Sequence, residues 1–584
     1  MGRIRSHDKR PRNGAFLLLR AWRQGMPLLF ALLLLIAPPV ADAASSQTSH
    51  PPAAAVASAH PLATRAGHEI LAAGGNAFDA AVAVSAALAV VEPYGSGLGG
   101  GGFWLLHRAA DGRDVMIDGR ERAPLAAHRD MYLDDQGNVV AGLSIDGPLS
   151  AAIPGTPAAL AHIAAHYGRL PLRRSLAPAL RYAREGFVVD EHYRRLARFR
   201  LEALRRSPAA ARIFLQEGEV PVLGHRIRQP ELAATLEALA ERGAAGFYRG
   251  AVAERLVRGV RAAGGIWTLQ DLADYRVIER EPLRGAYRGL RIVTAAPPSS
   301  GGMALLTMLN ILSGYDLERL DIVMRRHLIV EAMRRAYRDR AEYLGDPDFV
   351  AVPVERLIHP WYAAGLRASI RPDRATPSAA LPVAVEVPPP GAHTTHFSIL
   401  DREGNRVAAT LSINYPFGSA FVPPGTGVLL NDEMDDFSLK PGVPNVYGLI
   451  GAEANAIAPG KRPLSSMTPT FVETEQGVAI LGTPGGSRII TMVLLAILDL
   501  ASGNGPESWV ALPRFHHQFL PDEIQYEPGA LTEVEVSGLE ALGHRLKPLR
   551  DTYGNMQAVL WDRPRNRVAA ASDPRGVGSA ETQR

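Results

Sequence analysis

Short apolar-rich runs separated by polar turns stand out along the chain. Residues 394–400 and 406–414 flank a Gly-Asn turn, and residues 103–107 and 114–118 flank an Asp-Gly turn. Runs of this length around such a turn are typical of β-hairpins. The pattern therefore predicts two hairpins, one in each half of the chain, and places Thr394 at the start of a strand.

Longer stretches carry the 3.6-residue period of helices. Residues 77–91 are almost wholly apolar and follow a Gly-Gly-Asn break, so we expect a buried helix that is too short to cross a membrane. Residues 157–205 and 230–261 are helical by periodicity, with Arg and Glu on faces that we expect to be solvated. Two further helices are predicted over residues 323–345 and 489–500.

The first 43 residues have the pattern of a secretory signal. A basic segment precedes the apolar run 27–37, and Ala41-Asp42-Ala43 supplies small residues at the usual cleavage spacing. An uncleaved anchor is the alternative, but the run is shorter than the roughly 20 residues of a membrane span. We therefore expect residues 1–43 to be a signal peptide. The mature protein is expected to be periplasmic or extracellular, with no stable membrane anchor.

Composition narrows the possible chemistry. The chain has 584 residues, 47% hydrophobic and 21% charged, which is typical of a globular protein with a large core. It has no cysteine, which excludes disulfides, thiolate metal sites and cysteine nucleophiles. The net charge of +4 comes from the signal segment, which contains seven Lys and Arg but only two Asp. Without that segment the charge is about −1, so charge gives no reason to expect a nucleic-acid partner.

Thr394 has an unusual position in the sequence. A proline-rich stretch, residues 371–391, precedes it and has the composition of an exposed, extended segment. A threonine hydroxyl inside a chain has no base of its own. If the chain were cut before Thr394, the new α-amine, with a reference pKa near ~8, would lie beside the hydroxyl and could take its proton.

Two glycine-rich motifs allow different interpretations. Residues 95–102 have the spacing of a dinucleotide-binding loop, but a strand follows where that loop needs a helix, so close backbone packing is favoured. Residues 483–488 precede an apolar helix. Adjacent glycine N–H groups at a helix start can stabilise a developing negative charge. A simple turn with Ser487 as the helix cap is the equal alternative.

Charged and histidine clusters are less specific. Residues 432–436 hold four acids without the ligand spacing of a calcium loop. They could receive an ammonium group, although a solvated turn is favoured on their own evidence. Arg120 could clamp a carboxylate, but taken alone a surface ion pair is favoured. The adjacent histidines in residues 514–518 favour a structural role over zinc binding. No Gly-x-Ser-x-Gly elbow exists, which argues against an α/β-hydrolase.

Several motifs together resemble the γ-glutamyltranspeptidases of the exported bacterial type (γ-glutamyltransferases, or glutathione hydrolases). The matching runs extend from about residue 57 to the C-terminus and are jointly very specific. They comprise residues 74–81, 97–103, 297–302, 434–438, 441–448, 461–467, 513–518 and 572–575.

The resemblance implies an α+β fold of the N-terminal nucleophile hydrolase class, an αββα sandwich formed by two subunits cut from one precursor. It implies autocatalytic cleavage between His393 and Thr394, with residues 44–393 as the large subunit and 394–584 as the small catalytic subunit. The two would form a heterodimer. The activity implied is transfer of a γ-glutamyl group from glutathione or related compounds to water, amino acids or peptides, with no metal or organic cofactor.

The resemblance also assigns roles to individual residues. Thr394 is the nucleophile, its amine is the base, and Thr395 and Ser412 are candidates to support it, Ser412 standing where the family often has Thr. Gly485 and Gly486 correspond to an oxyanion hole, and Tyr447 to the gating aromatic of a lid loop over residues 441–451. The expected carboxylate-binding groups are Arg120, Ser465 and Ser466, and the expected amine-binding groups are Asn414, Glu433 and Asp436.

Two alternatives remain open. A cephalosporin (glutaryl) acylase shares the fold and the nucleophile, but a glutaryl group lacks the amine that Glu433 and Asp436 would bind. An unprocessed binding or scaffold protein that kept the fold is the other alternative. The two carboxyl groups favour γ-glutamyl chemistry over the first.

Overall fold

The computed structural model describes residues 50–381 and 394–584, which belong to one structural unit. The expected signal peptide, the end of the proline-rich stretch and His393 lie outside the described residues. Within the described ranges, no helix is long and apolar enough to cross a membrane.

A seven-stranded antiparallel sheet carries the nucleophile candidate. Its order is β18-β1-β9-β10-β2-β3-β6. Both predicted hairpins are confirmed, as β9/β10 and β2/β3, and β10 pairs with β2, so the hairpins lie side by side. The strands are β1 (Ala54–Ser58), β2 (Gly101–Arg108), β3 (Arg113–Gly119), β6 (Ile278–Arg280), β9 (Thr395–Leu400), β10 (Arg406–Ser412) and β18 (Ser579–Gln583).

A second antiparallel sheet, of six strands in the order β17-β16-β12-β11-β8-β7, stacks on the first. Its strands are β7 (Leu283–Tyr287), β8 (Leu290–Thr294), β11 (Thr470–Thr474), β12 (Gly477–Gly482), β16 (Gln557–Asp562) and β17 (Arg567–Ser572). The smaller sheets consist of β13 (Phe515–His516), β14 (Ile524–Tyr526) and β15 (Leu546–Pro548), and of β4 (Phe187–Val188) and β5 (Arg226–Ile227).

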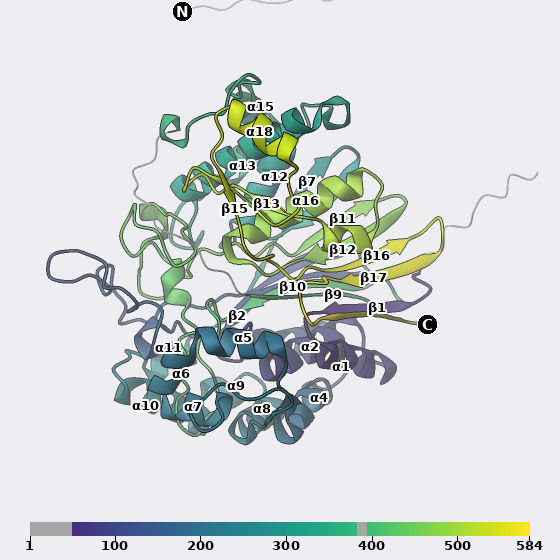
Figure 1. The fold of residues 1–584 in the computed structure, drawn as a ribbon. Helices are drawn as coiled ribbons and strands as arrows, with labels where there is room; N and C mark the ends of the chain where they lie inside the picture. The colour runs from purple at the N-terminus through teal and green to yellow at the C-terminus, as the bar shows by residue number, and fades with distance from the viewer. Residues whose placement is uncertain (1–49, 382–393) are drawn as a thin grey trace, which may run out of the picture. The chain divides into compact units, whose positions relative to one another are not determined.

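Strand β2 shows why the sheets stack. Phe103 and Leu105 join the core shared with the second sheet, whereas Trp104 and Leu106 join the core formed with the helices of the opposite face. Side chains alternate across a strand, so a strand with apolar residues at every position must be covered on both faces. The result is the expected αββα order of four layers (Figure 1).

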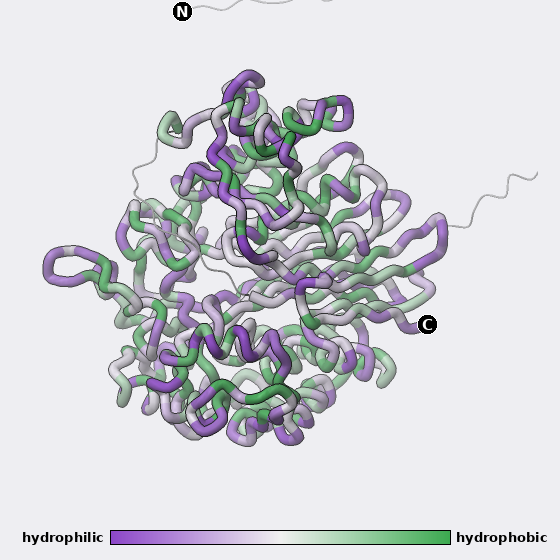
Figure 2. The backbone as a smooth tube through the Cα atoms, viewed as in Figure 1, coloured by the Kyte–Doolittle hydropathy of each residue, from purple (hydrophilic) through white to green (hydrophobic). Residues whose placement is uncertain are grey.

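The helices divide between the two outer layers, and hydrophilic colours gather on their outer turns and loops (Figure 2). One layer covers the seven-stranded sheet and comprises α1 (Pro61–Ala72), α2 (Ala77–Val91), α3 (Thr156–His166), α4 (Leu172–Glu185), α5 (Glu191–Phe199), α6 (Leu201–Arg206), α7 (Pro208–Phe214), α8 (Pro230–Arg242), α9 (Ala245–Tyr248), α10 (Gly250–Ala262) and α11 (Leu269–Ala273). The other comprises α12 (Gly301–Leu312), α13 (Ile322–Tyr343), α14 (Val354–Leu357), α15 (Pro360–Ala368), α16 (Ile489–Ala501), α17 (Pro506–Ala511) and α18 (Glu533–Ala541).

The predicted helices are confirmed where a single apolar stretch formed the signal. Helix α2 has the predicted bounds and is buried along its whole length, with a capping box between Asn76 and Asp79. Helices α13 and α16 match their predicted ranges within two residues. The stretches 157–205 and 230–261 are helical over most of their length, as predicted, but each is divided into several helices. Two of the breaks lie at glycines with positive φ, Gly186 at 85° before β4 and Gly243 at 59° after α8.

The glycine run at residues 95–102 packs closely against backbone, as predicted. A Cβ added at Gly99 would lie 2.0 Å from the carbonyl oxygen of Leu429, and one added at Gly100 would lie 2.1 Å from that of Ser412. No side chain fits at either position. The run therefore fixes the end of β10, where two site candidates, Ser412 and Asn414, lie.

Gly100→Ala tests this close approach. The added methyl group must displace the Ser412 carbonyl, so we expect a loss of about 1–3 kcal/mol in the free energy of unfolding. The control is Gly365→Ala in α15, where nothing lies within 4 Å of the added Cβ and helix propensity predicts a gain of up to about 1 kcal/mol. Thermal unfolding compares the two, and equal stability of both variants would contradict the packing argument.

Candidate active site

Thr394 lies immediately before β9, which pairs with β1 on one side and with β10 on the other. Only 8% of its surface is exposed. Leu411 pairs with Thr395 in the β9/β10 register, and continuing that register by one residue places Ser412 opposite Thr394. The residue thus begins a strand that is held between two neighbours, with β10 beside Thr394 itself, which gives its hydroxyl a fixed position at the edge of a cavity.

Most of the predicted site residues line this cavity together. They come from both halves of the chain: the end of β3, the start of β9, the end of β10, the acidic turn, the lid loop, the segment before β11 and the segment before α16. Those lining the cavity are Arg120, Thr394, Ser412, Asn414, Asp436, Tyr447, Ser465, Ser466 and Gly486. The apolar part of the wall was not predicted; it is made by Leu449, Met467 and Ile489.

Arg120 is buried among three carboxyl groups. Its guanidinium donates to Glu433 Oε2 at 2.5 Å and to Asp436 Oδ2 at 2.5 Å, and Glu121 Oε2 lies 3.3 Å away. Arg120 and Glu433 are 1% and 0% exposed. The separate interpretations of a surface ion pair and a solvated acidic turn were therefore wrong, because the two segments fold against each other and exclude water.

The charges of this cluster do not balance. Burial alone would lower the pKa of Arg120, but Glu433, Glu121 and Asp436 outweigh it and raise that pKa. Burial raises the pKa of Glu433 well above its usual value, and raises that of Glu121 to about 7, against the attraction of Arg120. Glu433 Oε1 and Glu121 Oε1 have no hydrogen-bond partner among the described residues. The cluster thus has unpartnered acceptor atoms, and a ligand cation beside them would favour the ionised form of these acids.

Gly485 and Gly486 adopt backbone conformations that suit glycine, with φ at 145° and 56°. They begin a short 3₁₀ turn that leads into α16. Ser487 makes no capping hydrogen bond to this turn. Its hydroxyl donates instead to Gln518 Oε1 at 2.7 Å, so the interpretation as a simple serine-capped turn was wrong. A helix start with exposed N–H groups favours a developing negative charge nearby.

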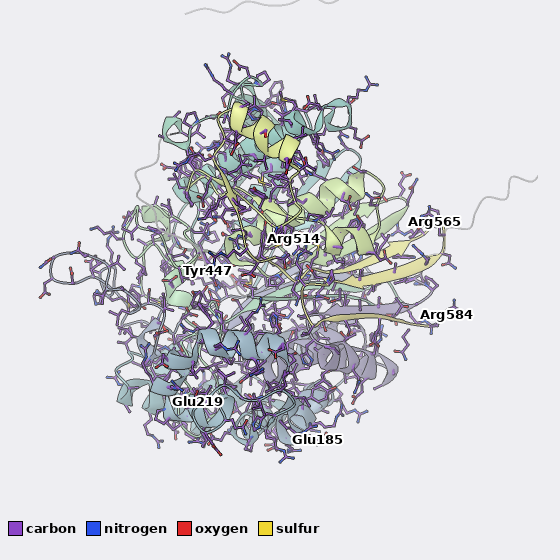
Figure 3. The ribbon with its side chains drawn as sticks, viewed as in Figure 1. Glu185, Glu219, Tyr447, Arg514, Arg565 and Arg584 are labelled. Atoms are coloured by element: carbon purple, nitrogen blue, oxygen red, sulfur yellow. The ribbon has the colours of Figure 1, made fainter. Side chains whose placement is uncertain are left out.

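Tyr447 covers the site from the lid loop. Its hydroxyl donates to the carbonyl oxygen of Asn414 at 2.7 Å. Its ring lies so close to Gly486 that a Cβ there would be 2.7 Å from a ring carbon. Gln518 Nε2 donates to the carbonyl oxygen of Gly448 at 3.0 Å. The lid is therefore fastened to both the nucleophile side and the glycine side of the cavity, between the two helical layers (Figure 3).

Three predicted residues do not line this cavity. Glu433 lies behind it, bonded to Arg120, and Gly485 lines an adjoining cavity that also reaches Thr394. Thr395 is fully buried and makes no hydrogen bond of good geometry. Its hydroxyl instead lies close enough to Glu92 to lower the pKa of that carboxyl, against the larger effect of burial. A supporting role for Thr395 stays a prediction.

Arg340 is a site neighbour that sequence reasoning missed. It lies on α13, 5% exposed, and donates to Ser300 Oγ at 3.0 Å and to Ser466 Oγ at 3.4 Å. Burial lowers its pKa to about 10, so it stays charged at neutral pH. Its positive charge behind Ser466 favours an anionic group at that serine. The signal for it was weak, because Arg340 is one of many arginines on that helix.

The adjacent histidines of residues 514–518 have side-chain partners within the protein. His516 bonds to Thr491 and Gln518, and His517 bonds to Asp522. A separate buried group of His327, Glu331 and His544 has suitable ligand atoms. However, Glu331 is ion-paired with Arg334 and Arg335, and these neighbouring cations oppose a metal ion there.

The chain is similar to several known proteins. The model of the family described as gamma-glutamyltranspeptidase matches residues 63–583. The glutathione hydrolase proenzyme of Escherichia coli (strain K12) is 42% identical over 93% of this chain and 94% of its own length. The cephalosporin acylase structure from Bacillus halodurans has a TM-score of 0.79 at 30% identity, covering 91% of this chain and 96% of its own. The gamma-glutamyltranspeptidase structure from Helicobacter pylori has a TM-score of 0.54 at 42% identity, covering 55% of this chain and 92% of its own.

Asp435→Asn tests the charge balance of the acidic turn. Burial raises the pKa of Asp435 to about 7, although the Val446 N–H and the Ser144 hydroxyl both donate to it. The folded state therefore holds a proton that the unfolded chain releases near pH 4, so this carboxyl's contribution to stability falls as pH rises from 4 to 7, by at most about 1.4 kcal/mol per pH unit.

The melting temperature of the wild type should fall relative to that of Asp435→Asn across this pH range. A constant difference between the two proteins from pH 4 to pH 7 would show that Asp435 is ionised in the folded state.

Proposed function

The chain belongs to the γ-glutamyltranspeptidase family, and from this premise we propose that it cleaves the γ-glutamyl amide of glutathione and related compounds. The γ-glutamyl group passes to water or to the amine of an amino acid or peptide. One observation carries the proposal: a single cavity joins a hydroxyl at a strand start, one glycine of the pair before α16 and a buried cluster of opposite charges. A γ-glutamyl group has a carboxylate and an ammonium at one end and an amide carbonyl at the other, which needs all three.

Arg120, Ser465 and Ser466 bind the substrate carboxylate in this proposal, with Arg340 adding positive charge from behind. Asp436, Glu433 and Asn414 receive the ammonium. The surplus of carboxyl groups around Arg120 supports this arrangement, since the arriving carboxylate takes over part of the guanidinium while the ammonium neutralises the acids.

The γ-carbonyl then lies between Thr394 Oγ and the N–H groups of Gly485 and Gly486. The α-amine of Thr394 takes the hydroxyl proton while Oγ attacks the carbonyl carbon, and the glycine N–H groups stabilise the oxyanion. The same amine returns the proton to the leaving nitrogen as the amide bond breaks, which leaves a γ-glutamyl ester on Thr394. Water or an acceptor amine attacks this ester and completes the transfer.

A free α-amine requires cleavage before Thr394. We propose that Thr394 Oγ attacks the His393 carbonyl and that the resulting ester is hydrolysed, giving subunits 44–393 and 394–584. They would stay together as a heterodimer, because β9 of one subunit pairs with β1 of the other. Export of the protein to the periplasm or the medium is part of the same proposal.

Structural likeness to a cephalosporin acylase gives a second candidate function. A glutaryl group carries the distal carboxylate and lacks the ammonium. In that case, Glu433 and Asp436 would share the single positive charge of Arg120 with the ligand carboxylate and gain no ammonium, which costs free energy in a buried site. The acidic pair therefore favours γ-glutamyl over glutaryl substrates.

Thr394→Ala tests both processing and catalysis. We expect one intact polypeptide on a denaturing gel where the wild type gives two fragments, and a loss of hydrolysis of γ-glutamyl 4-nitroanilide of at least about a thousandfold. Thr394→Ser is the matched control, since it keeps a hydroxyl and should still be cleaved, more slowly.

An intact wild-type chain that turns over γ-glutamyl amides would contradict the proposed role of the Thr394 α-amine as the base. An intact, inactive wild type would instead support the unprocessed binding or scaffold protein.

A substrate pair separates the two enzyme candidates. The wild type should have a higher kcat/KM for γ-glutamyl 4-nitroanilide than for glutaryl 4-nitroanilide, by at least about tenfold, because a charge-assisted hydrogen bond contributes about 1.5–3 kcal/mol. Asp436→Asn should reduce the ratio of the two kcat/KM values, because it weakens binding of the substrate ammonium. Faster cleavage of the glutaryl anilide would assign the chain to the acylases.

A further inference from the structure

Gln518 belongs to the histidine motif of residues 514–518, to which the proposed reaction gives no role. It is 5% exposed and, among the described residues, is not part of the lining of either cavity that reaches Thr394. Its side chain instead joins two segments that do line them. These are the lid loop and the turn that carries Gly485 and Gly486.

The amide oxygen of Gln518 faces the glycine turn. Oε1 accepts from the Ser487 hydroxyl at 2.7 Å, and Ser487 follows Gly486 directly in the chain. His516 Nε2 lies 2.9 Å from the same oxygen. Burial and Arg488 lower the pKa of His516 to about 3, so this ring is neutral. Because an amide oxygen can only accept, the single N–H of the ring must lie on Nε2, and both acceptor positions of the oxygen are filled.

The amide nitrogen of Gln518 faces the lid. Nε2 donates to the carbonyl oxygen of Gly448 at 3.0 Å and to that of Tyr447 at 3.3 Å. A side chain that accepts on one side and donates on the other must be an amide here, since a carboxylate has no donor and an ammonium has no acceptor. Gln518 thus fixes the lid and the glycine turn relative to each other.

Residues of the predicted large subunit hold the turn on which Gln518 lies. The Ser378 hydroxyl donates to the carbonyl oxygen of Phe519 at 2.6 Å, and the Ser378 N–H donates to Asp522 Oδ2 at 2.7 Å. Arg334, on α13, donates to the Ser378 hydroxyl at 2.6 Å and forms an ion pair with Asp522. Ser378 and Arg334 are 1% and 2% exposed. Cleavage at the predicted position breaks none of these bonds.

We propose that Gln518 is a positioning residue whose amide holds the Gly486 N–H in place against the lid, and that Ser378 supports it from across the cleaved subunit boundary. The inference rests on the proposed function, in which this N–H stabilises the oxyanion. It gives the end of the large subunit a lasting part in catalysis after the chain has been cut.

Gln518→Met tests the amide, because methionine has a similar length and lacks the amide's N–H donors and carbonyl acceptor. In the processed enzyme, kcat for γ-glutamyl 4-nitroanilide should fall at least about tenfold, because a displaced oxyanion donor loses part of its effect. KM should change by less than about twofold, since the groups that bind the γ-glutamyl end are untouched.

Gln518→Glu is a second variant for the case in which Gln518→Met does not fold. It keeps an acceptor for Ser487 and His516 but has no donor for the lid carbonyl groups, so kcat should fall in the same way.

Gln229→Met is the matched control. Gln229 is 2% exposed, and its amide nitrogen also donates to a backbone carbonyl oxygen, that of Val90 at 2.8 Å. Among the described residues it is not part of the lining of either cavity that reaches Thr394. The substitution should lower the melting temperature about as much as Gln518→Met does and leave kcat unchanged.

Two inhibitors distinguish positioning from a loss of folded protein. Glutamate resembles the bound γ-glutamyl group, whereas its γ-boronic acid analogue resembles the transition state. The Thr394 oxygen bonds to boron, its proton passes to the α-amine, and the boronate becomes tetrahedral and negative. In Gln518→Met the Ki of the boronic acid should rise at least about tenfold, and that of glutamate less than about twofold.

A double-mutant cycle tests the link across the subunit boundary. Ser378→Ala should lower kcat about threefold in the wild type and cause no further fall in the Gln518 variant, because both substitutions act on one turn. Ser313→Ala is the control. Ser313 is an exposed serine of the large subunit whose hydroxyl donates to the carbonyl oxygen of Asn310 at 2.8 Å, and its replacement should leave kcat unchanged.

The outcomes separate the inference from the proposed function. A wild type that cleaves the anilide, with kcat unchanged in both Gln518 variants, overturns the inference alone. An equal fall of kcat in Gln229→Met, or an equal rise of both Ki values in Gln518→Met, also overturns it. Additive effects in the cycle overturn the role of Ser378. A processed wild type that does not cleave the anilide overturns the proposed function, and the inference with it.

Discussion

The site depends on one buried guanidinium. Arg120 donates to side chains of the acidic turn and to the carbonyl oxygens of Pro463 and Leu464, while its own carbonyl accepts from Tyr275. Segments more than three hundred residues apart are thereby fixed around one charge. Removing that charge would leave three carboxyl groups buried together without a counterion, which no packing could offset. The site and this part of the core are thus a single electrostatic arrangement.

Strong local patterns made much of the fold predictable. The hairpin β9/β10 and helix α2 were evident because an apolar run of defined length, bounded by glycine or asparagine, allows few alternatives. The stretches 157–205 and 230–261 are mostly helical, as predicted. Their division into separate helices was not predicted, because periodicity continues on either side of turns such as those at Gly186 and Gly243. Such a break depends on local backbone geometry, and the period of the pattern does not reveal it.

The candidate site was less accessible to reasoning from the residues alone. Arg120 and the acidic turn each have the local sequence of an ordinary surface segment. Only the resemblance to a family assigned both of them to one substrate-binding site. Arg340 and Glu92 could not be recognised for another reason. Each stands in a helix or at a helix end, and only the fold brings Arg340 against Ser466 and places Glu92 on the wall of a cavity beside Thr394. Tertiary contacts decide that, and no short motif encodes it.

The C-terminal strand β18 pairs with β1, so that Ala54 lies opposite Gln583 at the outer edge of the seven-stranded sheet. The two ends of the folded core are therefore neighbours, and a short peptide could connect them. A circular permutant that joins these ends and opens the chain at residue 394 would be synthesised with threonine as its first residue once the initiator methionine is removed. In such a molecule the amine that maturation must otherwise liberate would exist from translation onward, which would uncouple the chemistry of turnover from the chemistry of self-cleavage.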